Sequence, residues 1–182
     1  VDECVQILTD ILFGIYPNQF NSVCVLEDMV KPITNVFLIL FTSPTILCDH
    51  VFTKRASSIC AMFESNPIRA CAIILSISYQ FLQVTANAEL LQTLLDVKCA
   101  GLKENNSNNS LVLFCIKSLF TYEKAQETEN CKLLAFRVLH LLCTRSSKVA
   151  HSFFDFYEQA VYAEQNPKIR ELILASIFEI LY

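Results

Sequence analysis

Residues 66–84 read NPIRACAIILSISYQFLQV, and this stretch decides the fold. Asn66 followed by Pro67 is a helix-start signal, because the missing N–H of proline costs nothing at the first helical position. The helix that follows is apolar around most of its circumference and keeps only a narrow polar line of Arg69, Ser76, Gln80 and Gln83. A helix of this kind is sandwiched between other helices rather than lying on a surface. The stretch therefore predicts a layered, all-helical fold.

The helical periodicity continues on both sides of this stretch. Asp2 is a predicted N-cap, and Ser43 before Pro44 repeats the start signal. Gly101 is a predicted C-terminal glycine, and a polar linker follows it at residues 103–109. We expect about nine helices with short connections. They cover about 2–15, 22–30, 44–63, the stretch that starts at Pro67, 88–99, 110–122, 129–144, 147–163 and 167–182, and Pro32 starts a further, strongly apolar segment that runs to Phe41.

The composition excludes several classes of protein. Of the 182 residues, 53% are hydrophobic and 18% are charged, which is too apolar for a disordered chain. The two glycines, Gly14 and Gly101, are too few for a β-sandwich or barrel and too far apart for a phosphate-binding loop. The length favours a single domain over residues 1–182. Because the chain starts at Val1 and ends inside an apolar helical pattern, we expect a fragment of a longer protein.

The net charge of −4 does not favour nucleic-acid binding. Phosphate neutralisation dominates such binding and normally needs a concentrated basic stripe. The sequence has no basic run, and only a folded face could gather the basic residues Lys117, Lys124, Lys132 and Arg137. We therefore expect no nucleic-acid partner, although a nucleic-acid-binding solenoid that uses these C-terminal basic residues stays open as an alternative.

The nine cysteines indicate a reducing compartment. No two lie closer than eleven residues, so there is no CxxC pair for zinc or thiol redox chemistry. Most lie in apolar runs, where a free cysteine packs as a small hydrophobic residue. We expect an intracellular protein, cytoplasmic or nuclear. The sequons at Asn105 and Asn108 are interpreted as unused linker residues, and whether either is ever glycosylated stays open.

No membrane span or signal peptide is expected. The longest uncharged stretch, Ala70–Ala88, has nineteen residues and is long enough to cross a bilayer. It carries a polar load that argues against insertion, namely Ser76, Ser78, Gln80, Gln83, Thr85 and Asn87. At the N-terminus, no basic region precedes an apolar segment.

Internal repetition indicates stacked helical hairpins. The sequence NPIR at residues 66–69 recurs as NPKIR at residues 166–170, and both lead into similar apolar helices. Candidate inner helices start near residues 32, 67, 110, 131 and 167. Three of the four gaps between these starts fall near the ~33–47 residues of helical-hairpin repeats.

On these motifs the chain resembles the armadillo/HEAT class of helical repeats over most of its length. The openings NPIR and NPKIR are similar to the start of a HEAT inner helix, which often carries Pro followed by Arg or Asp. The resemblance implies an irregular α-solenoid of antiparallel helical hairpins. It also implies an interaction scaffold without chemistry of its own.

No catalytic or metal-binding constellation stands out in the sequence. His140 and Cys143 lie three residues apart on one predicted helix, but zinc needs about four ligands and only His151 is a further candidate. The Cys-Asp-His run at residues 48–50 suggests a nucleophile, but adjacent residues on a helix point in different directions. We therefore expect no enzyme, no metal site and no cofactor.

The aromatic run near the C-terminus is the main candidate binding site. One helix cannot bury on one narrow side all of its aromatic residues, which are Phe153, Phe154, Phe156, Tyr157 and Tyr162. Part of this set is expected to face a groove or a partner, because aromatic residues are enriched at binding hot spots. Packing against neighbouring repeats is the alternative. Arg137 and His140, on the polar line of the preceding helix, are further candidate partner-binding residues.

The last helix is a second candidate surface. Its apolar residues Ile173, Ile177, Ile180 and Leu181 would be covered by a further repeat or by a partner. The sequence therefore favours a non-enzymatic scaffold that binds a protein, a peptide or its own copy, as a possible homodimer. A helical domain with an apolar pocket for a small molecule or lipid is the other open alternative.

Overall fold

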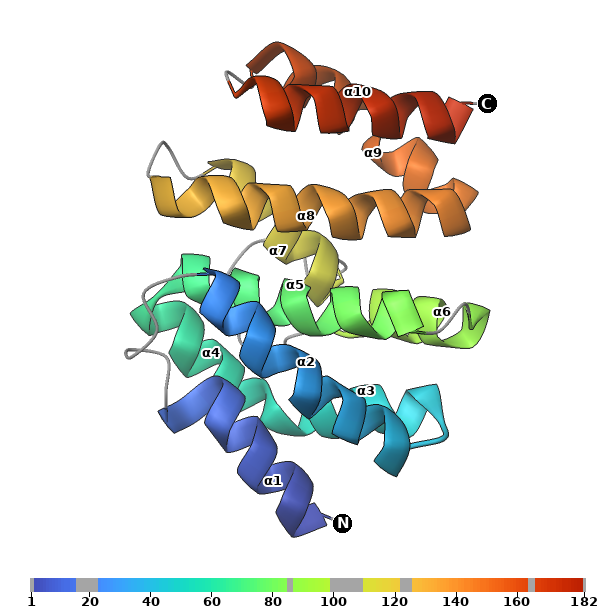
Figure 1. The fold of residues 1–182 in the computed structure, drawn as a ribbon. Helices are drawn as coiled ribbons and strands as arrows, with labels where there is room; N and C mark the ends of the chain where they lie inside the picture. Colours follow the sequence, from blue (N-terminus) through green and yellow to red (C-terminus); the bar gives the residue numbers. More distant parts are fainter. Residues whose placement is uncertain are drawn as a thin grey trace.

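The computed structural model describes residues 2–15, 23–84, 87–98, 110–121, 126–163 and 166–181. Within these ranges the backbone is helical apart from short turns, and it contains no β-strand (Figure 1). The all-α class expected from the sequence is confirmed. The predicted linker at 103–109, including both sequon asparagines, lies outside the described residues.

The helices lie close to their predicted positions. A π-helical turn, Ile11–Ile15, extends the first of them, and a 3-10 turn, Thr53–Arg55, joins the third to the fourth. The α-helices are α1 (Asp2–Asp10), α2 (Val23–Leu40), α3 (Pro44–Val51), α4 (Ala56–Ser65), α5 (Pro67–Val84), α6 (Ala88–Asp96), α7 (Leu111–Thr121), α8 (Gln126–Arg145), α9 (Ser147–Ala163) and α10 (Pro167–Leu181).

Both Asn-Pro start signals cap a helix as predicted. The Asn66 side-chain oxygen accepts a hydrogen bond from the backbone N–H of Arg69 at 3.1 Å. The Asn166 side-chain oxygen accepts one from the backbone N–H of Lys168 at 3.0 Å. Each bond satisfies a donor that the first helical turn would otherwise leave unpaired. The repeated motif therefore sets the starts of α5 and α10.

Pro32 lies inside α2 and does not begin a new segment, so the boundary predicted there is wrong. Proline lacks the N–H that would bond to the carbonyl of Asp28, but both residues are exposed and water can serve that carbonyl. On the opposite side, Val30 and Phe37 are fully buried. Their burial packs α2 onto the core on both sides of the proline.

The single helix predicted from Pro44 to Phe63 is divided into α3 and α4. Leu47, Val51 and Ile59 are buried and follow a spacing of four residues. Arg55 lies at the position of this spacing between Val51 and Ile59. An uninterrupted helix would aim the guanidinium into the core, which is costly for an unpaired charge. The turn at residues 53–55 leaves Arg55 half-buried, and its Nε atom is still buried without a hydrogen-bond partner in the described chain.

Helix α5 is the centre of the fold. The nine residues from Ala70 to Ser78 are all buried. They pack against α2, α4, α7 and α8, so the prediction that this helix is sandwiched is confirmed. The predicted polar line holds only in part. Gln83 is exposed, whereas Ser76 is 2% exposed and its hydroxyl has no partner within the described chain.

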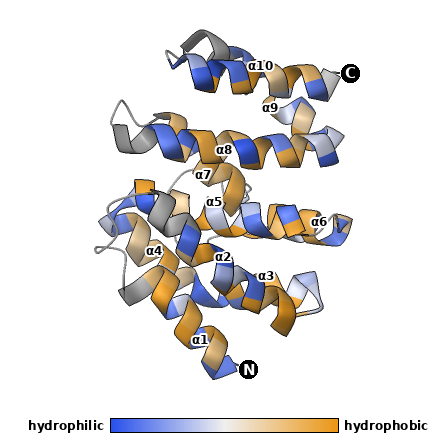
Figure 2. Ribbon diagram, viewed as in Figure 1, coloured by the Kyte–Doolittle hydropathy of each residue, from blue (hydrophilic) through white to orange (hydrophobic). Residues whose placement is uncertain are grey.

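Four helices follow one another through the molecule. α2 packs on α5, α5 on α8, and α8 on α10. In Figure 1, α5, α8 and α10 run in the same direction, and α7 and α9 lie behind α8 and α10. Hydrophobic residues run along α7, inside this stack, whereas the visible face of α8 alternates between hydrophilic and hydrophobic turns (Figure 2). We call α2, α5, α8 and α10 the helix row.

Hydrogen bonds fix several of these helices to one another. The Arg145 guanidinium at the end of α8 donates to the backbone carbonyl of Leu82 in α5 at 2.8 Å. The backbone N–H of Leu111 donates to the carbonyl of Val97 at 2.8 Å, which joins the end of α6 to the start of α7. This bond therefore holds the end of α6 next to the start of α7.

Helix α5 is also long and apolar enough to cross a membrane, judged by length and composition, and it is the one such helix in the described ranges. Inside the fold, 61% of the 18 residues of this helix are buried. A core helix of this composition meets the same criterion, so the feature is weak evidence for a membrane span.

No disulfide bond joins the cysteines that the structure describes. Cys4 is exposed and Cys60 is partly buried. The other five are buried, as expected for core-filling residues, namely Cys48, Cys71, Cys115, Cys131 and Cys143. Cys24 and Cys99 lie outside the side chains that the structure describes.

Truncation of Phe81 is expected to destabilise the fold by about 3–5 kcal/mol. The side chain is fully buried in α5, and its ring meets the Phe52 ring edge-on at a centroid distance of 6.5 Å. Urea unfolding of the Phe81→Ala variant, followed by circular dichroism, measures the loss. The matched control Val84→Ala removes a side chain that is 59% exposed in the same helix and should cost less than about 0.5 kcal/mol. Equal losses in the two variants would contradict the central position of α5.

Candidate binding cleft

A cleft of about 190 Å³ opens between α5, α8 and α10. Leu141, Leu172 and Ala175 give it apolar walls, and the nearly buried Ser176 also lines it. Its charged or polar groups are Tyr79 from α5, Arg137 and His140 from α8, and Glu179 from α10. Two residues predicted to bind a partner, Arg137 and His140, therefore lie in one site.

Two hydrogen-bond donors of the cleft have no acceptor among the described residues. Arg137 is exposed and makes no ion pair or hydrogen bond there. The hydroxyl oxygen of Tyr79 accepts a hydrogen bond from the Gln83 amide nitrogen at 2.6 Å. This bond uses an oxygen lone pair, so the hydroxyl hydrogen of Tyr79 stays available. The cleft therefore offers a guanidinium and a phenol hydrogen to a ligand.

His140 joins α8 to α10. Its Nε2 atom lies 2.9 Å from the Oε2 atom of Glu179. Because a carboxylate only accepts, we assign the hydrogen of this bond to Nε2. The other ring nitrogen, Nδ1, is buried without a partner in the described part of the chain. The exposed polar line predicted for this helix holds for Arg137 and Thr144, whereas the His140 side chain is only 28% exposed and faces α10.

A buried polar cluster adjoins the cleft at Ser176. The Tyr157 hydroxyl makes no hydrogen bond of standard geometry with the described chain, and Cys143 and Ser176 are the side chains that face it. Burial raises the pKa of the Cys143 thiol to about 11. Burial, together with the neighbouring Cys143, also raises the pKa of Tyr157 above its usual range. Both groups therefore stay protonated at neutral pH.

The predicted aromatic site is mostly core. Phe153 and Tyr157 are each 1% exposed, so these two candidate partner-binding residues pack in the core, which was the alternative for part of the set, and Phe156 is partly buried. Phe156 meets the ring of Phe120 in α7 edge-on at 5.1 Å. Phe154 alone is exposed among these, at 44%. The side chain of Tyr162 lies outside the described set.

The exposed face of α10 differs from the predicted one. Ile173 is fully buried and Ile177 partly so, whereas Leu174 and Phe178 are 51% and 65% exposed. The side chains of Ile180 and Leu181 are outside the described set. Leu174 and Phe178 lie four residues apart, so they share one face of the helix, away from the buried side.

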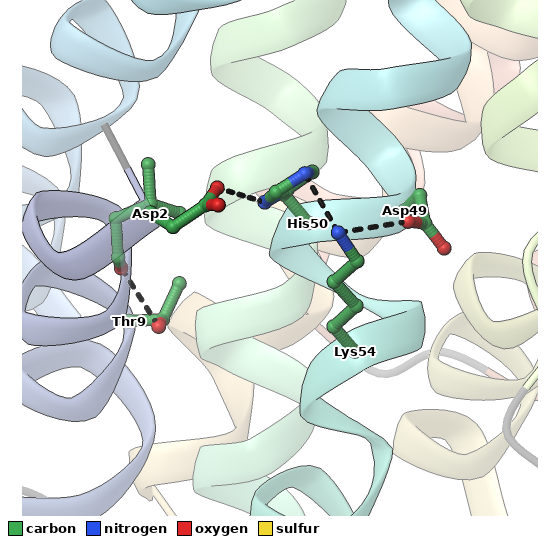
Figure 3. A network of polar contacts seen from close by, with 6 residues as sticks. Asp2, Thr9, Asp49, His50 and Lys54 are labelled. Carbon is green, nitrogen blue, oxygen red and sulfur yellow. Dashed lines mark hydrogen bonds and ion pairs between the residues drawn. The ribbon is translucent and has the colours of Figure 1, made fainter.

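The histidine of the Cys-Asp-His run belongs to a polar network that joins α1 to α3 (Figure 3). His50 lies between Asp2, 3.6 Å from its Nδ1, and Lys54, 2.8 Å from its Nε2. Lys54 also pairs with Asp49 at 3.5 Å. Because the ammonium group only donates, Nε2 accepts and Nδ1 carries a hydrogen toward Asp2.

Cys48 is no part of this network. It is 1% exposed, and burial raises the pKa of its thiol to about 12, so the thiolate is scarce at neutral pH. The three residues of the Cys-Asp-His run therefore have different structural roles. His50 and Asp49 link elements at the surface, and Cys48 fills the core.

The metal site considered for His140, Cys143 and His151 finds no support in the geometry. Across the described ranges, no three His, Cys, Asp or Glu residues are grouped so that they could hold a metal ion. Cys143 faces Tyr157, and His151 Nδ1 lies 2.7 Å from the backbone carbonyl of Ser147.

No protein-family model, no curated protein and no solved structure matches this chain.

Raising the pH is expected to destabilise the protein in a way that depends on Cys143. The unfolded thiol titrates near 9.0, whereas the folded one titrates near 11. Between pH 9 and pH 11 the unfolded thiol loses its proton while the folded thiol keeps it. The contribution of Cys143 to the free energy of unfolding is therefore fully present below pH 9 and is lost as the pH rises toward 11. Urea unfolding between pH 8 and pH 10.5 measures this slope (on the order of 1 kcal/mol per pH unit at most). Cys143→Ala should show a shallower slope, and an unchanged slope would contradict the burial of the thiol.

Proposed function

We propose that this protein is a non-enzymatic scaffold that binds a partner protein through the surface of an irregular, armadillo/HEAT-like helical repeat. The observation that carries the proposal is the helix row, in which α2, α5, α8 and α10 pack one on the next. Ile39 of α2, Val84 of α5 and Phe178 of α10 are exposed on these helices, and helical-repeat proteins bind partners on extended surfaces made by stacked helices.

The repeated start signal supports the repeat interpretation. The Asn-Pro caps begin α5 and α10, two members of the helix row with the same direction (Figure 1). The second-layer helices α7 and α9 pack against α8, which lies between α5 and α10. A motif that recurs at the start of two helices with the same direction is expected when helical hairpins stack as repeats.

The surface of the helix row supports binding rather than catalysis. It exposes large apolar side chains, Val36 and Ile39 on α2, Val84 on α5, and Leu174 and Phe178 on α10. Burial of such side chains is the main gain in protein association. At the cleft, by contrast, the thiol and phenol nearest to Ser176 stay protonated, and His140 is engaged with Glu179.

Affinity capture with the tagged chain, followed by mass spectrometry and light scattering, tests this function. We expect a stoichiometric protein, or a second copy of the chain, that is reduced at least about fivefold in the double variant Leu174→Ser/Phe178→Ser, since each exposed apolar contact is worth about 1 kcal/mol. The matched control Ile7→Ser/Ile46→Ser removes two side chains that are 61% and 50% exposed outside the helix row. It should leave capture unchanged.

Two results would overturn the proposal. One is a chain that captures no protein and stays monomeric while its circular dichroism shows a folded helical protein. The other is capture that survives in Leu174→Ser/Phe178→Ser and is lost in Ile7→Ser/Ile46→Ser.

A further inference from the structure

We infer that the cleft between α5, α8 and α10 recognises an acidic, apolar segment of a partner protein, with an apolar side chain in the cleft and a neighbouring carboxylate on Arg137 and Tyr79. This inference rests on the proposed function and specifies the chemistry of the partner. It follows from the donors, the walls and the charges of the cleft.

The donors of the cleft match a carboxylate. Arg137 has no acceptor in the described chain, and its planar guanidinium can give two parallel hydrogen bonds to one carboxylate. The Tyr79 hydroxyl has a free hydrogen because its oxygen already accepts from Gln83. An acidic side chain would satisfy both donors, whereas a basic side chain would meet a like charge.

The walls match one apolar side chain. The cleft measures about 190 Å³, and Leu141, Leu172 and Ala175 line it. This volume is below that of pockets that enclose drug-sized ligands, which is about 300–1,000 Å³. It suits a single side chain of a longer chain that lies across the helix row. The partner segment therefore places Leu, Ile or Phe beside Asp or Glu.

Among the charged groups of the cleft, Arg137 is the one that has no partner in the described chain. Glu179 is the acidic group of the site, and it already accepts from His140 Nε2 at 2.9 Å. His140 cannot offer its other nitrogen, because Nδ1 is buried. Glu179 still repels an acidic segment, so its neutralisation should strengthen binding. Arg137 and Glu179 thus predict effects of opposite sign, which a structural defect would not produce.

Selection of a displayed random seven-residue peptide library on the intact chain tests the inference. The expected result is enrichment of peptides with Asp or Glu next to Leu, Ile or Phe. Fluorescence polarisation of one such labelled peptide should show about tenfold weaker binding to Arg137→Gln, since charge-assisted hydrogen bonds are lost. Tyr79→Phe should weaken binding about threefold, and Glu179→Gln should strengthen it about threefold.

The matched control is Lys148→Gln, which removes the same charge from an exposed position on α9, outside the cleft. It should change the affinity less than twofold. Peptides that bind with no acidic preference, or equally to Arg137→Gln, overturn the inference. If such peptides instead lose binding to Leu174→Ser/Phe178→Ser, the proposed scaffold function survives without the cleft. A library that yields no binder to the folded chain overturns this inference as well.

Discussion

The structure depends on the burial of α5 on every side. Nine consecutive residues, Ala70 to Ser78, are buried, so no turn of this segment can face water. Fully burying a Val, Leu, Ile or Phe side chain is worth about 1.5–3 kcal/mol, and this helix buries several of them. A helix with no polar face must be surrounded by others. Helices α2, α4, α7 and α8 satisfy that requirement.

The candidate site follows from this constraint. α8 covers one side of α5, and its own thin polar line is left facing outward between α5 and α10. Arg137 and His140 lie on that line, and Glu179 reaches back from α10 to hold His140. The cleft is therefore the place where three helices of the row meet without filling the space between them.

The sequence predicts the helices well because their start signals and periodicity are local. Asn66 and Asn166 cap helices as expected, and the apolar character of α5 predicts its central place. Local patterns fail where a single residue breaks the pattern. Arg55 divides α3 from α4, because its charge falls on the buried stripe, and Pro32 does not divide α2, because it faces water.

The site could be predicted only in part. The polar line of α8 pointed to Arg137, but Tyr79, Ser176 and Glu179 come from other helices, and periodicity does not tell which helices meet. Helix α10 is apolar around much of its circumference, so the sequence could not choose between Ile173 and Leu174 for the core. For α9 the sequence did contain a pattern that indicates which face is buried. Val149, Phe153 and Tyr157 are spaced by four and share the buried face, which leaves Phe154 outside.

Native-state hydrogen exchange, read by mass spectrometry, tests most directly whether α5 organises the fold. If its burial holds the other helices in place, the amides of residues 70–78 exchange last, with the free energy of global unfolding. α9 and α10, which cover the far end of the helix row, then open first. Exchange in α5 that is as fast as in α10, while the protein remains folded, would contradict the central role of α5.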